Sequence, residues 1–194
     1  MKKFWLLAAF AILFVPPVFA ASTAPVLVMG KPDALITIDD YSSLGCPHCA
    51  DFHLNTLPKI KKDFIDTGKV KLVFHEFPLD KASLDAALLV ACVPPAQAWD
   101  AITLLYFQQD KWAHDEKYND KLVGYGQMLG LTEPAVKACL NDTAKRDALL
   151  QGRMDASQKQ QVEGTPTLIF NNGKARMVGS QPYDQIAGAI KQGN

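Results

Sequence analysis

Alternating and helical hydrophobic patterns divide the first part of the chain into short elements. The β-branched run 35–41 predicts a strand, and 26–29 predicts an edge strand before it. Residues 47–67 carry apolar positions three or four apart, which predicts a helix that Pro58 should kink. Residues 70–77 carry apolar side chains at both even-numbered and odd-numbered positions, which is typical of a strand buried on both faces. A strand, a helix and a strand with a short return predict a βαβ unit with parallel strands.

The pattern after Pro78 is helical over a long stretch and then returns to strands. Helices are predicted over residues 83–92, 96–109, 119–129, 133–140 and 143–161. After them, 167–170 and 175–178 predict a hairpin, and the Asn-Asn-Gly sequence of 171–173 suits a turn with positive φ. Pro182 fits the first turn of a last helix.

The order of these elements indicates an α/β fold with two parts. Residues 21–78 and 164–194 carry βαβ followed by ββα, which predicts one small domain with a mixed sheet. Residues 79–163 have only helical patterning, which predicts an all-helical domain inserted into the first. Both parts are long enough to bury a core. Three aromatic residues of the 96–109 helix are expected to pack the core of the insert: Trp99, Tyr106 and Phe107.

The N-terminus has the pattern of a secretory signal peptide. Met1-Lys2-Lys3 is cationic, residues 4–15 are apolar, and Pro16-Pro17 breaks any helix. This apolar run is shorter than the roughly 20 residues that a membrane span needs, so we expect residues 1–20 to be cleaved after Ala20. The mature chain then has 194 − 20 = 174 residues. Export to the periplasm would allow its cysteines to form lasting disulfides.

The composition is that of a globular protein without an excess of charge. Hydrophobic residues make up 48% of the chain, and 20 basic side chains balance 20 acidic ones. Removal of Lys2 and Lys3 with the signal peptide leaves 18 against 20, a net charge of −2. Nucleic acids and anionic membranes attract clustered positive charge, so this balance argues against both as partners.

Two of the four cysteines lie where the first predicted strand ends and the long helix begins. Cys46 and Cys49 are three residues apart, so they face the same side of the helix within reach of a disulfide. Cys46 is nearer the helix N-terminus, where unpaired N–H groups and the helix dipole favour a thiolate. Pro47 fits the first helical position, because its missing N–H costs nothing there. A cationic His48 would stabilise the thiolate further.

This asymmetry predicts separate roles for the two sulfurs and a direction of electron flow. Cys46 exchanges with substrates, and Cys49, one turn deeper, resolves the mixed disulfide. A stabilised Cys46 thiolate is a good leaving group and favours the dithiol form, so the disulfide form should be an oxidant.

Other chemistries remain as alternatives for this pair. Together with His53, the cysteines would make a copper- or zinc-handling module, although no second pair of ligands has matching spacing. Covalent haem attachment needs His directly after the second cysteine, where Ala50 stands. An inert disulfide would constrain the unfolded chain little, because its loop is short. The sequence therefore favours thiol–disulfide exchange, with no cofactor and no bound metal.

The motif and its surroundings resemble the DsbA-type thiol:disulfide oxidoreductases, a periplasmic branch of the thioredoxin-fold proteins. The resemblance rests on Cys46-Pro47-His48-Cys49, on Gly164-Thr165-Pro166-Thr167 before the hairpin, on the helical insert and on residues 29–38. It spans nearly the whole mature chain. It implies a thioredoxin-like mixed sheet with an inserted all-helical domain, and oxidation of folding exported proteins that have free cysteines.

The resemblance also assigns roles to three further residues. Pro166 matches the family's cis-proline, which packs beside the reactive pair. The backbone of Thr165 would pair with an extended substrate segment, as in strand addition. Asp40, six residues before Cys46, matches the family's buried acid and would relay a proton to or from Cys49. Asp39 is the competing candidate, and one of the two should be solvated.

Thr165 also departs from the commonest pattern of the oxidases. Many of them carry Val at this position, and Thr is usual in the related isomerases, so an isomerase or reductase kept in the dithiol form remains an alternative. The dimeric isomerases add an N-terminal dimerisation domain, whereas the first strand here follows the signal peptide almost at once. We therefore expect a monomeric oxidase, which the resemblance implies is reoxidised by a quinone-linked membrane partner of the DsbB type.

Cys92 and Cys139 both lie in the helical segment. Because Cys46 and Cys49 are so close, a bridge between Cys92 and Cys139 is the economical pairing, and it is similar to a second bridge in some DsbA-like proteins. The alternative is two buried thiols, since cysteine is often a small core residue.

Overall fold

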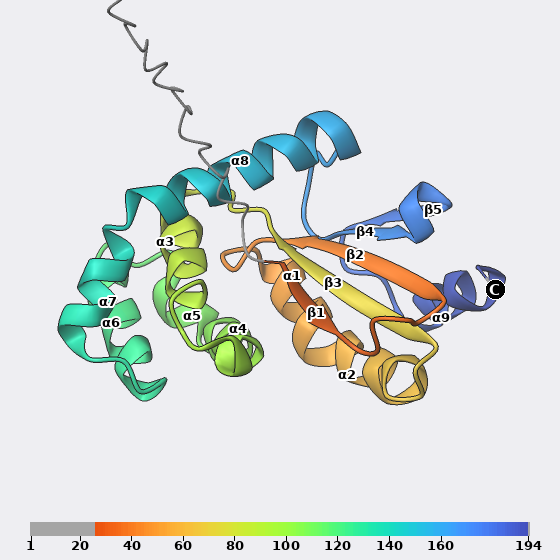
Figure 1. Cartoon of the computed structure of the whole chain (residues 1–194), viewed down its shortest axis with the longest axis horizontal. Coiled ribbons are helices and arrows are strands. Elements are labelled where there is room, and N and C mark those ends of the chain that lie inside the picture. Colours follow the sequence, from red (N-terminus) through yellow and green to blue (C-terminus); the bar gives the residue numbers. More distant parts are fainter. Residues whose placement is uncertain (1–25, 194) are drawn as a thin grey trace, which may run out of the picture.

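The computed structural model describes residues 26–193 and places five strands of that range in one mixed sheet (Figure 1). The strands are β1 (Leu27–Met29), β2 (Ile36–Ser42), β3 (Val70–Glu76), β4 (Thr167–Phe170) and β5 (Ala175–Val178). Their order is β1-β3-β2-β4-β5, with β2 and β3 parallel and the other pairs antiparallel. The predicted parallel unit and mixed sheet are confirmed. The predicted signal peptide lies outside the described residues.

Helices connect the strands and cover the sheet. Between β2 and β3 lie α1 (Pro47–Asp51) and α2 (Leu57–Ile60). Between β3 and β4 lie α3 (Lys81–Val90), α4 (Ala98–Phe107), α5 (Gln109–Trp112), α6 (Tyr118–Met128), α7 (Glu133–Leu140) and α8 (Thr143–Gln160). Single 3-10 turns occur at Pro95–Gln97 and Asn171–Gly173, and α9 (Tyr183–Gln192) follows β5.

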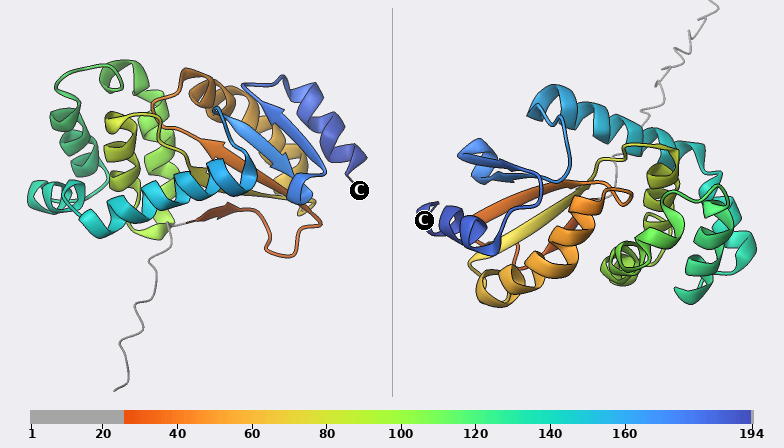
Figure 2. Two further views of the ribbon diagram at one scale, coloured as in Figure 1. Left: turned by 90° about the horizontal axis from the view of Figure 1, so that it is seen from above. Right: turned by 180° about the vertical axis from the view of Figure 1, so that it is seen from behind.

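The two faces of the sheet bury different side chains, because successive residues of a strand point to opposite faces. Ile38 of β2, Leu72 of β3 and Leu168 of β4 belong to the larger hydrophobic core. Tyr41 lies in a smaller cluster, together with Ala156 of α8. Figure 2 shows α8 along one face of the sheet, while α1, α2 and α9 lie on the other. The α1 face therefore carries the main core.

The helical run between β2 and β3 is not uniform. π-Helical turns at Phe52–Thr56 and Lys61–Ile65 lie on either side of α2. Pro58 lies within α2 and has no backbone N–H, so the regular hydrogen-bond ladder cannot continue unchanged past it. The sequence predicts one helix with a kink at Pro58, and the structure shows a helical run whose winding changes around this residue.

The helices between β3 and β4 pack on one another beside the sheet (Figure 1). Leu88 of α3, Ile102 of α4 and Leu122 of α6 are fully buried, and they belong to the same cluster as the core beneath the sheet. Asp85 of α3 is also buried, and its carboxylate forms a 2.9 Å ion pair with Arg146 of α8. Apolar burial is thus continuous between the helices and the sheet.

The three aromatic residues expected in the core of the helical segment have different environments. Tyr106 is buried. Trp99 is half-buried, and its ring lies edge-on to Phe74 of β3 at 5.8 Å between centroids, so it packs against the sheet. Phe107 is 70% exposed, so its predicted burial is wrong. It directly follows Tyr106, and neighbouring helix positions point about 100° apart.

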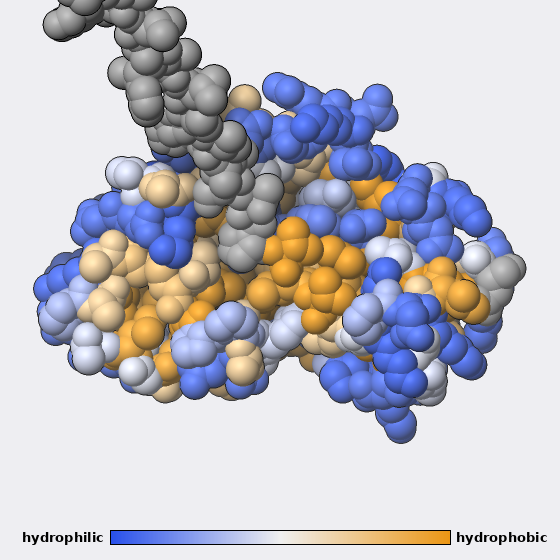
Figure 3. All heavy atoms as spheres, in the orientation of Figure 1, coloured by the Kyte–Doolittle hydropathy of each residue, from blue (hydrophilic) through white to orange (hydrophobic). Residues whose placement is uncertain are grey.

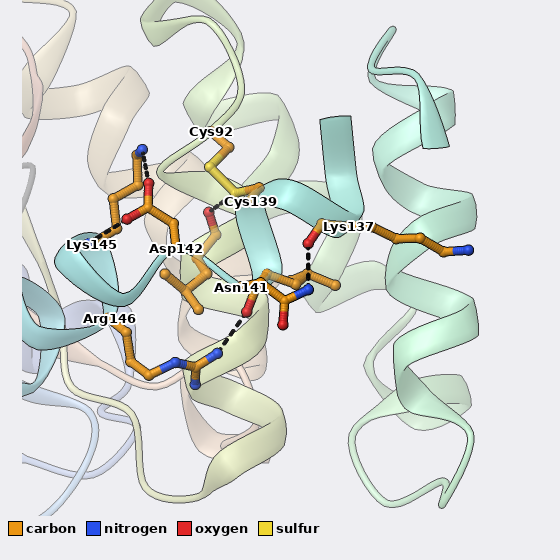
Figure 4. Close-up of a disulfide and its surroundings, with 9 residues drawn as sticks. Cys92, Lys137, Cys139, Asn141, Asp142, Lys145 and Arg146 are labelled. Carbon is orange, nitrogen blue, oxygen red and sulfur yellow. Dashed lines mark hydrogen bonds and ion pairs between the residues drawn. A yellow bond between two sulfur atoms is a disulfide. The ribbon is translucent and has the colours of Figure 1, made fainter. Parts of the chain in front are cut away.

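A disulfide joins Cys92, just after α3, to Cys139 in α7 (Figure 4). The two Cα atoms are 6.2 Å apart, which is an ordinary span for a disulfide. Beyond the bridge, the Asn141 side chain donates a 2.8 Å hydrogen bond to the carbonyl oxygen of Lys137, and the Asp142 side chain caps α8 (Figure 4). The bridge therefore ties α7 to the end of α3, close to where α8 begins.

An apolar area lies near the centre of the surface shown in Figure 3, in the region of the edge strand β1. Val26 and Val28 contribute to the exposed apolar surface at this edge and are 52% and 48% exposed. Within residues 26–193, no helix combines the length and the apolar character that crossing a bilayer requires.

Removal of the bridge between α3 and α7 should lower stability. We expect the variant Cys92→Ala/Cys139→Ala to lose up to about 4 kcal/mol in the free energy of unfolding, because the bridge constrains a loop of about 48 residues in the unfolded chain. Urea titrations under oxidising conditions measure this difference. Under reducing conditions the difference from the parent protein should shrink, and a difference that persists there would assign the loss to packing.

Candidate active site

The Cys46-Pro47-His48-Cys49 motif lies where β2 passes into α1. Cys46 has extended backbone angles and occupies the N-cap of α1, and Pro47 follows at the first helical position. The Cys46 carbonyl oxygen accepts the N–H groups of Cys49 and Ala50, both at 3.1 Å. The Cys46 N–H donates to the carbonyl oxygen of Ser43 at 3.0 Å. These bonds fix the Cys46 backbone at the helix terminus, as the sequence predicts.

Two side chains from the helical segment hold the loop that precedes Cys46. The Gln109 amide donates to the carbonyl oxygens of Leu44 at 2.6 Å and Cys46 at 3.1 Å. The Tyr106 hydroxyl donates to the carbonyl oxygen of Ser43 at 3.4 Å. Gln109 and Tyr106 are both buried. No local sequence pattern distinguishes these two residues from other helical residues, so the sequence does not predict this role for either.

The environment of Cys46 favours its thiolate. Its pKa is lowered to about 5, chiefly by a hydrogen bond from the Cys49 thiol, against the opposing effect of burial. A hydrogen bond from Thr165 and the backbone N–H groups of Cys49 and His48 lower this pKa further. The His48 side chain is exposed, and the contribution of this residue comes from its backbone, whereas the sequence suggested its imidazole.

Thr165 and Pro166 lie directly beside Cys46, although they are distant in sequence. The peptide bond between Thr165 and Pro166 is cis. As a thiol, Cys46 donates to the Thr165 carbonyl oxygen at 3.4 Å. The thiolate has no proton to donate. The buried Thr165 hydroxyl, which has no partner within residues 26–193, is a potential donor to the charged sulfur and lowers its pKa. The structure therefore brings this loop and the cysteine motif together.

Cys49 has the opposite environment. The two cysteines are unbonded in this structure, so it represents the reduced form. Cys49 is fully buried, and its sulfur accepts a 3.4 Å hydrogen bond from the Ser43 N–H. Burial, the neighbouring Cys46 thiolate and the negative charge of Asp40 all raise the pKa of Cys49. At neutral pH, therefore, Cys49 is a thiol and Cys46 a thiolate.

Asp40 and Asp39 have the different environments that the sequence left open. Asp40 is buried, accepts a 2.5 Å hydrogen bond from the Ser42 hydroxyl, and has a pKa raised by burial to about 7. Asp39 points to the other face of the sheet and is 2.8 Å from the His75 ring nitrogen. Asp40 is thus the buried acid near Cys49.

Glu76, at the end of β3, carries a further buried carboxyl group in this region, and the sequence predicts no role for it. Both of its carboxylate oxygens are buried, and they have no hydrogen-bond partner among the described residues. Burial and the charge of Asp40 raise its pKa well above the ordinary value. A charged residue at the end of an apolar strand is usually solvated, so the sequence carries no signal for this burial.

His53, the third residue of the metal-binding alternative, faces α4. It is buried, its Nε2 lies 3.0 Å from the Thr103 hydroxyl, and burial lowers its pKa to about 4. Across residues 26–193, no group of three or more His, Cys, Asp or Glu side chains is arranged to hold a metal ion.

Comparisons with known proteins agree with this geometry. A family model described as thioredoxin matches residues 22–192. The chain belongs to the thioredoxin family. A putative protein-disulfide oxidoreductase of Rickettsia conorii is 32% identical over 84% of this chain, although the chain spans only 58% of that relative's length. Disulfide bond formation protein D of Bacillus subtilis is 28% identical over 85% of this thioredoxin-family chain and 75% of its own.

Solved structures show which branch of the thioredoxin family the chain resembles. Wolbachia pipientis alpha-DsbA1 superposes with a TM-score of 0.78 at 27% identity, over 87% of this chain and 92% of its own. BdbD from Bacillus subtilis, in its oxidised form, gives a TM-score of 0.76 at 28% identity, over 88% and 92%. The sequence resemblance to the DsbA type is therefore confirmed, as is the thioredoxin-like fold of this family member.

Because the Cys49 thiol makes the largest contribution to the low pKa of Cys46, the variant Cys49→Ala should raise that pKa. We expect thiolate absorbance of the reduced parent protein to appear around pH 5 and that of the variant to appear at higher pH. Ultraviolet titration measures both, and Cys46→Ser supplies the baseline. An unchanged midpoint in Cys49→Ala would show that the helix terminus and Thr165 stabilise the thiolate without the Cys49 thiol.

Proposed function

We propose that this DsbA-type protein is a thiol:disulfide oxidoreductase that donates the disulfide formed by Cys46 and Cys49 to folding proteins. The observation that carries the proposal is the contrast between the two sulfurs. Cys46 lies at a helix N-terminus with a pKa of about 5, whereas Cys49 is buried and its pKa is raised. The relatives named as a putative protein-disulfide oxidoreductase and as disulfide bond formation protein D support the same activity.

The contrast sets the direction of the reaction. Every group that stabilises the Cys46 thiolate stabilises the dithiol form of the protein relative to its disulfide. The protein therefore gains free energy when it gives its disulfide away, which is the property of an oxidant. An isomerase or reductase that works from the dithiol state needs the same cysteines, but the low pKa of Cys46 favours the oxidase.

The proposed reaction has two exchange steps. A substrate thiolate forms a bond to the Cys46 sulfur, the bond from Cys46 to Cys49 breaks, and its electron pair passes to Cys49, which takes up a proton. A second substrate thiolate then attacks the substrate sulfur of the mixed disulfide and releases Cys46 as a thiolate. The substrate loses two electrons and two protons; the protein keeps both electrons and one proton, and the other proton passes to solvent.

Three groups around the pair have proposed supporting roles. Thr165, whose carbonyl is 3.4 Å from Cys46, would bind an extended substrate segment through its backbone, with the adjacent cis Pro166 shaping that surface. Asp40 would supply the proton that Cys49 needs, since its pKa of about 7 lets it act as a donor near neutral pH. Pro47 and His48 would position Cys46 through the first turn of α1.

We further propose that the protein acts outside the cytoplasm. The signal-peptide pattern of residues 1–20 supports export to the periplasm, and substrates would be exported proteins with free cysteines. A quinone-linked membrane oxidase of the DsbB type would restore the disulfide. Residues 79–163 would form a helical insert in the thioredoxin-like domain of a monomeric protein.

The oxidised protein should oxidise a reduced protein substrate. We expect it to restore activity to reduced, unfolded ribonuclease in stoichiometric amounts. The variant Cys46→Ser should lose at least about 10³-fold in rate, because it lacks the sulfur that exchanges with substrates and cannot form the disulfide with Cys49. Equilibration with a glutathione buffer gives the direction independently. A pair that is fully oxidised in a buffer poised near −220 mV would contradict the oxidase assignment.

In cells that contain the reoxidising partner, the pair should be held as a disulfide. Thiol trapping of acid-quenched cells, followed by a gel-shift assay, should find Cys46 and Cys49 mostly oxidised. The variant Cys46→Ser/Cys49→Ser marks the position of a protein without this pair. A mostly reduced pair would favour the isomerase or reductase instead.

A further inference from the structure

Glu76 is a buried acid that the proposed reaction leaves unused. Part of the residue is accessible to solvent, but both carboxylate oxygens are buried without a hydrogen-bond partner within residues 26–193. An ionised carboxylate without partners in such a place is very costly, whereas a protonated carboxyl group is much less so. Such a residue needs either a structural or a chemical explanation.

The sheet register places Glu76 on the face of the sheet that carries Asp40. Phe74 of β3 pairs with Asp40, and Glu76 pairs with Ser42, whose hydroxyl is bonded to Asp40. Since side chains alternate along a strand, all four residues point to the α1 face. Glu76 is therefore a diagonal neighbour of Asp40, in the layer beneath the cysteine motif.

The groups around the two acids come from several elements. Asp40 and Ser42 belong to β2, Cys49 to α1 and Tyr106 to α4. Burial is the largest cause of the raised pKa of Tyr106, and the charges of Cys49, Asp40 and Glu76 raise this pKa further. These charge effects agree with the placement of the three ionisable groups on one face of the sheet. His75, next to Glu76, lies on the opposite face beside Asp39. Its charge lowers the pKa of Asp40, but this effect is smaller than the increase that burial causes.

We propose that Glu76 is a reserve proton donor, which acts through Asp40 to supply the proton that Cys49 takes up when the protein gives its disulfide away. When the bond from Cys46 to Cys49 breaks, the electron pair arrives on the Cys49 sulfur. The proton reaches that sulfur from Asp40. Where Asp40 is ionised, it first receives a proton from Glu76, and solvent later returns one to Glu76. Glu76 touches no substrate, so it is a positioning residue.

The two acids should act in different ranges of pH. Asp40, with a pKa of about 7, is protonated below neutrality and ionised above it. Burial and the negative charge of Asp40 both raise the pKa of Glu76. The Ser42 hydroxyl stabilises ionised Asp40, whereas the Glu76 oxygens have no such donor within residues 26–193, so Asp40 should lose its proton first. The reserve donor therefore matters above neutral pH. This inference rests on the proposed function, because it concerns the same exchange step.

The experiment compares the pH dependence of protein reduction in three variants. Oxidised protein is mixed with a cysteine-containing model peptide, and the rate, divided by the fraction of peptide thiolate, is measured by rapid-quench thiol trapping from about pH 5 to about pH 9. Glu76→Gln removes the reserve proton with little change of shape. Glu76→Asp restores an acid, and Glu116→Gln, at an exposed position, is the matched control.

We expect Glu76→Gln to match the parent protein below neutral pH and to lose about tenfold or more in rate above it, a modest part of what a positioned acid supplies. Glu76→Asp should recover part of the loss, and Glu116→Gln should follow the parent throughout. A purely structural role would instead lower the rate equally at every pH. That uniform loss, or an unchanged profile in Glu76→Gln, would overturn the proposal.

A spectroscopic measurement on the parent protein does not depend on the folding of any variant. Infrared difference spectra between the oxidised and reduced forms at about pH 8, above the pKa of Asp40 near 7, should contain the band of a protonated carboxyl group. The band should vanish in Glu76→Gln and persist in Glu116→Gln. Its absence from the parent protein would show that no protonated carboxyl group responds to the change between the two forms and would overturn the inference.

Failure of this inference is distinguishable from failure of the proposed function. If the parent protein oxidises ribonuclease through Cys46 and Glu76→Gln has an unchanged profile, only the role of Glu76 is wrong. If Cys46→Ser oxidises as well as the parent does, the exchange mechanism itself fails, whatever the result at Glu76.

Discussion

The hydrogen bonds that the Cys46 thiolate receives are the interaction on which the rest of the site depends. The Cys49 thiol, the first N–H groups of α1 and Thr165 all favour the charged sulfur, and together they outweigh the cost of its burial. A thiolate that is stable at neutral pH makes the dithiol form favourable, and this is what gives the disulfide its oxidising character in the proposed function. Each of these donors requires the backbone of Cys46 to stay at the helix terminus.

Three separate segments of the chain hold that geometry. β2 delivers the motif, the cis-proline loop presents Thr165, and the helical segment contributes Gln109, whose amide binds the carbonyl oxygens of Leu44 and Cys46. The helices between β3 and β4 therefore do more than cover the sheet. They supply the donors that fix the loop before the reactive sulfur, and their apolar residues share a core with the sheet.

Beneath the sulfurs, ionisable groups lie in a region that excludes water. Cys49, Asp40 and Glu76 all have raised pKa values, for which burial is the largest cause. Burying such groups costs stability, and proteins retain this kind of local conflict mainly at functional sites. The arrangement separates the charged Cys46 sulfur from the protons held by Cys49 and the buried acids. Thiol–disulfide exchange needs this separation, because one sulfur must leave as an anion while the other is protonated.

The sequence by itself determined the features that depend on neighbouring residues. Cys46 and Pro47 at a helix start, the parallel pair of β2 and β3, and the mixed sheet with its helical segment follow from local pattern and from the right-handed twist of the chain. The motif, together with the segment 164–167 and the helical insert, was also sufficient to indicate the family. Its physical content is local, because an N-cap and a three-residue spacing place both sulfurs on one helical turn.

Only the tertiary structure decided the features that depend on residues far apart in the chain. It distinguished Asp40 from Asp39 by the face of the sheet to which each points, buried the carboxylate of Glu76, and brought Gln109 to the loop before Cys46. It also decided that Phe107 is exposed, although the preceding residue, Tyr106, is buried. The physical reason is the same in each case: burial and pKa are set by what packs against a side chain, and the sequence does not contain that information locally.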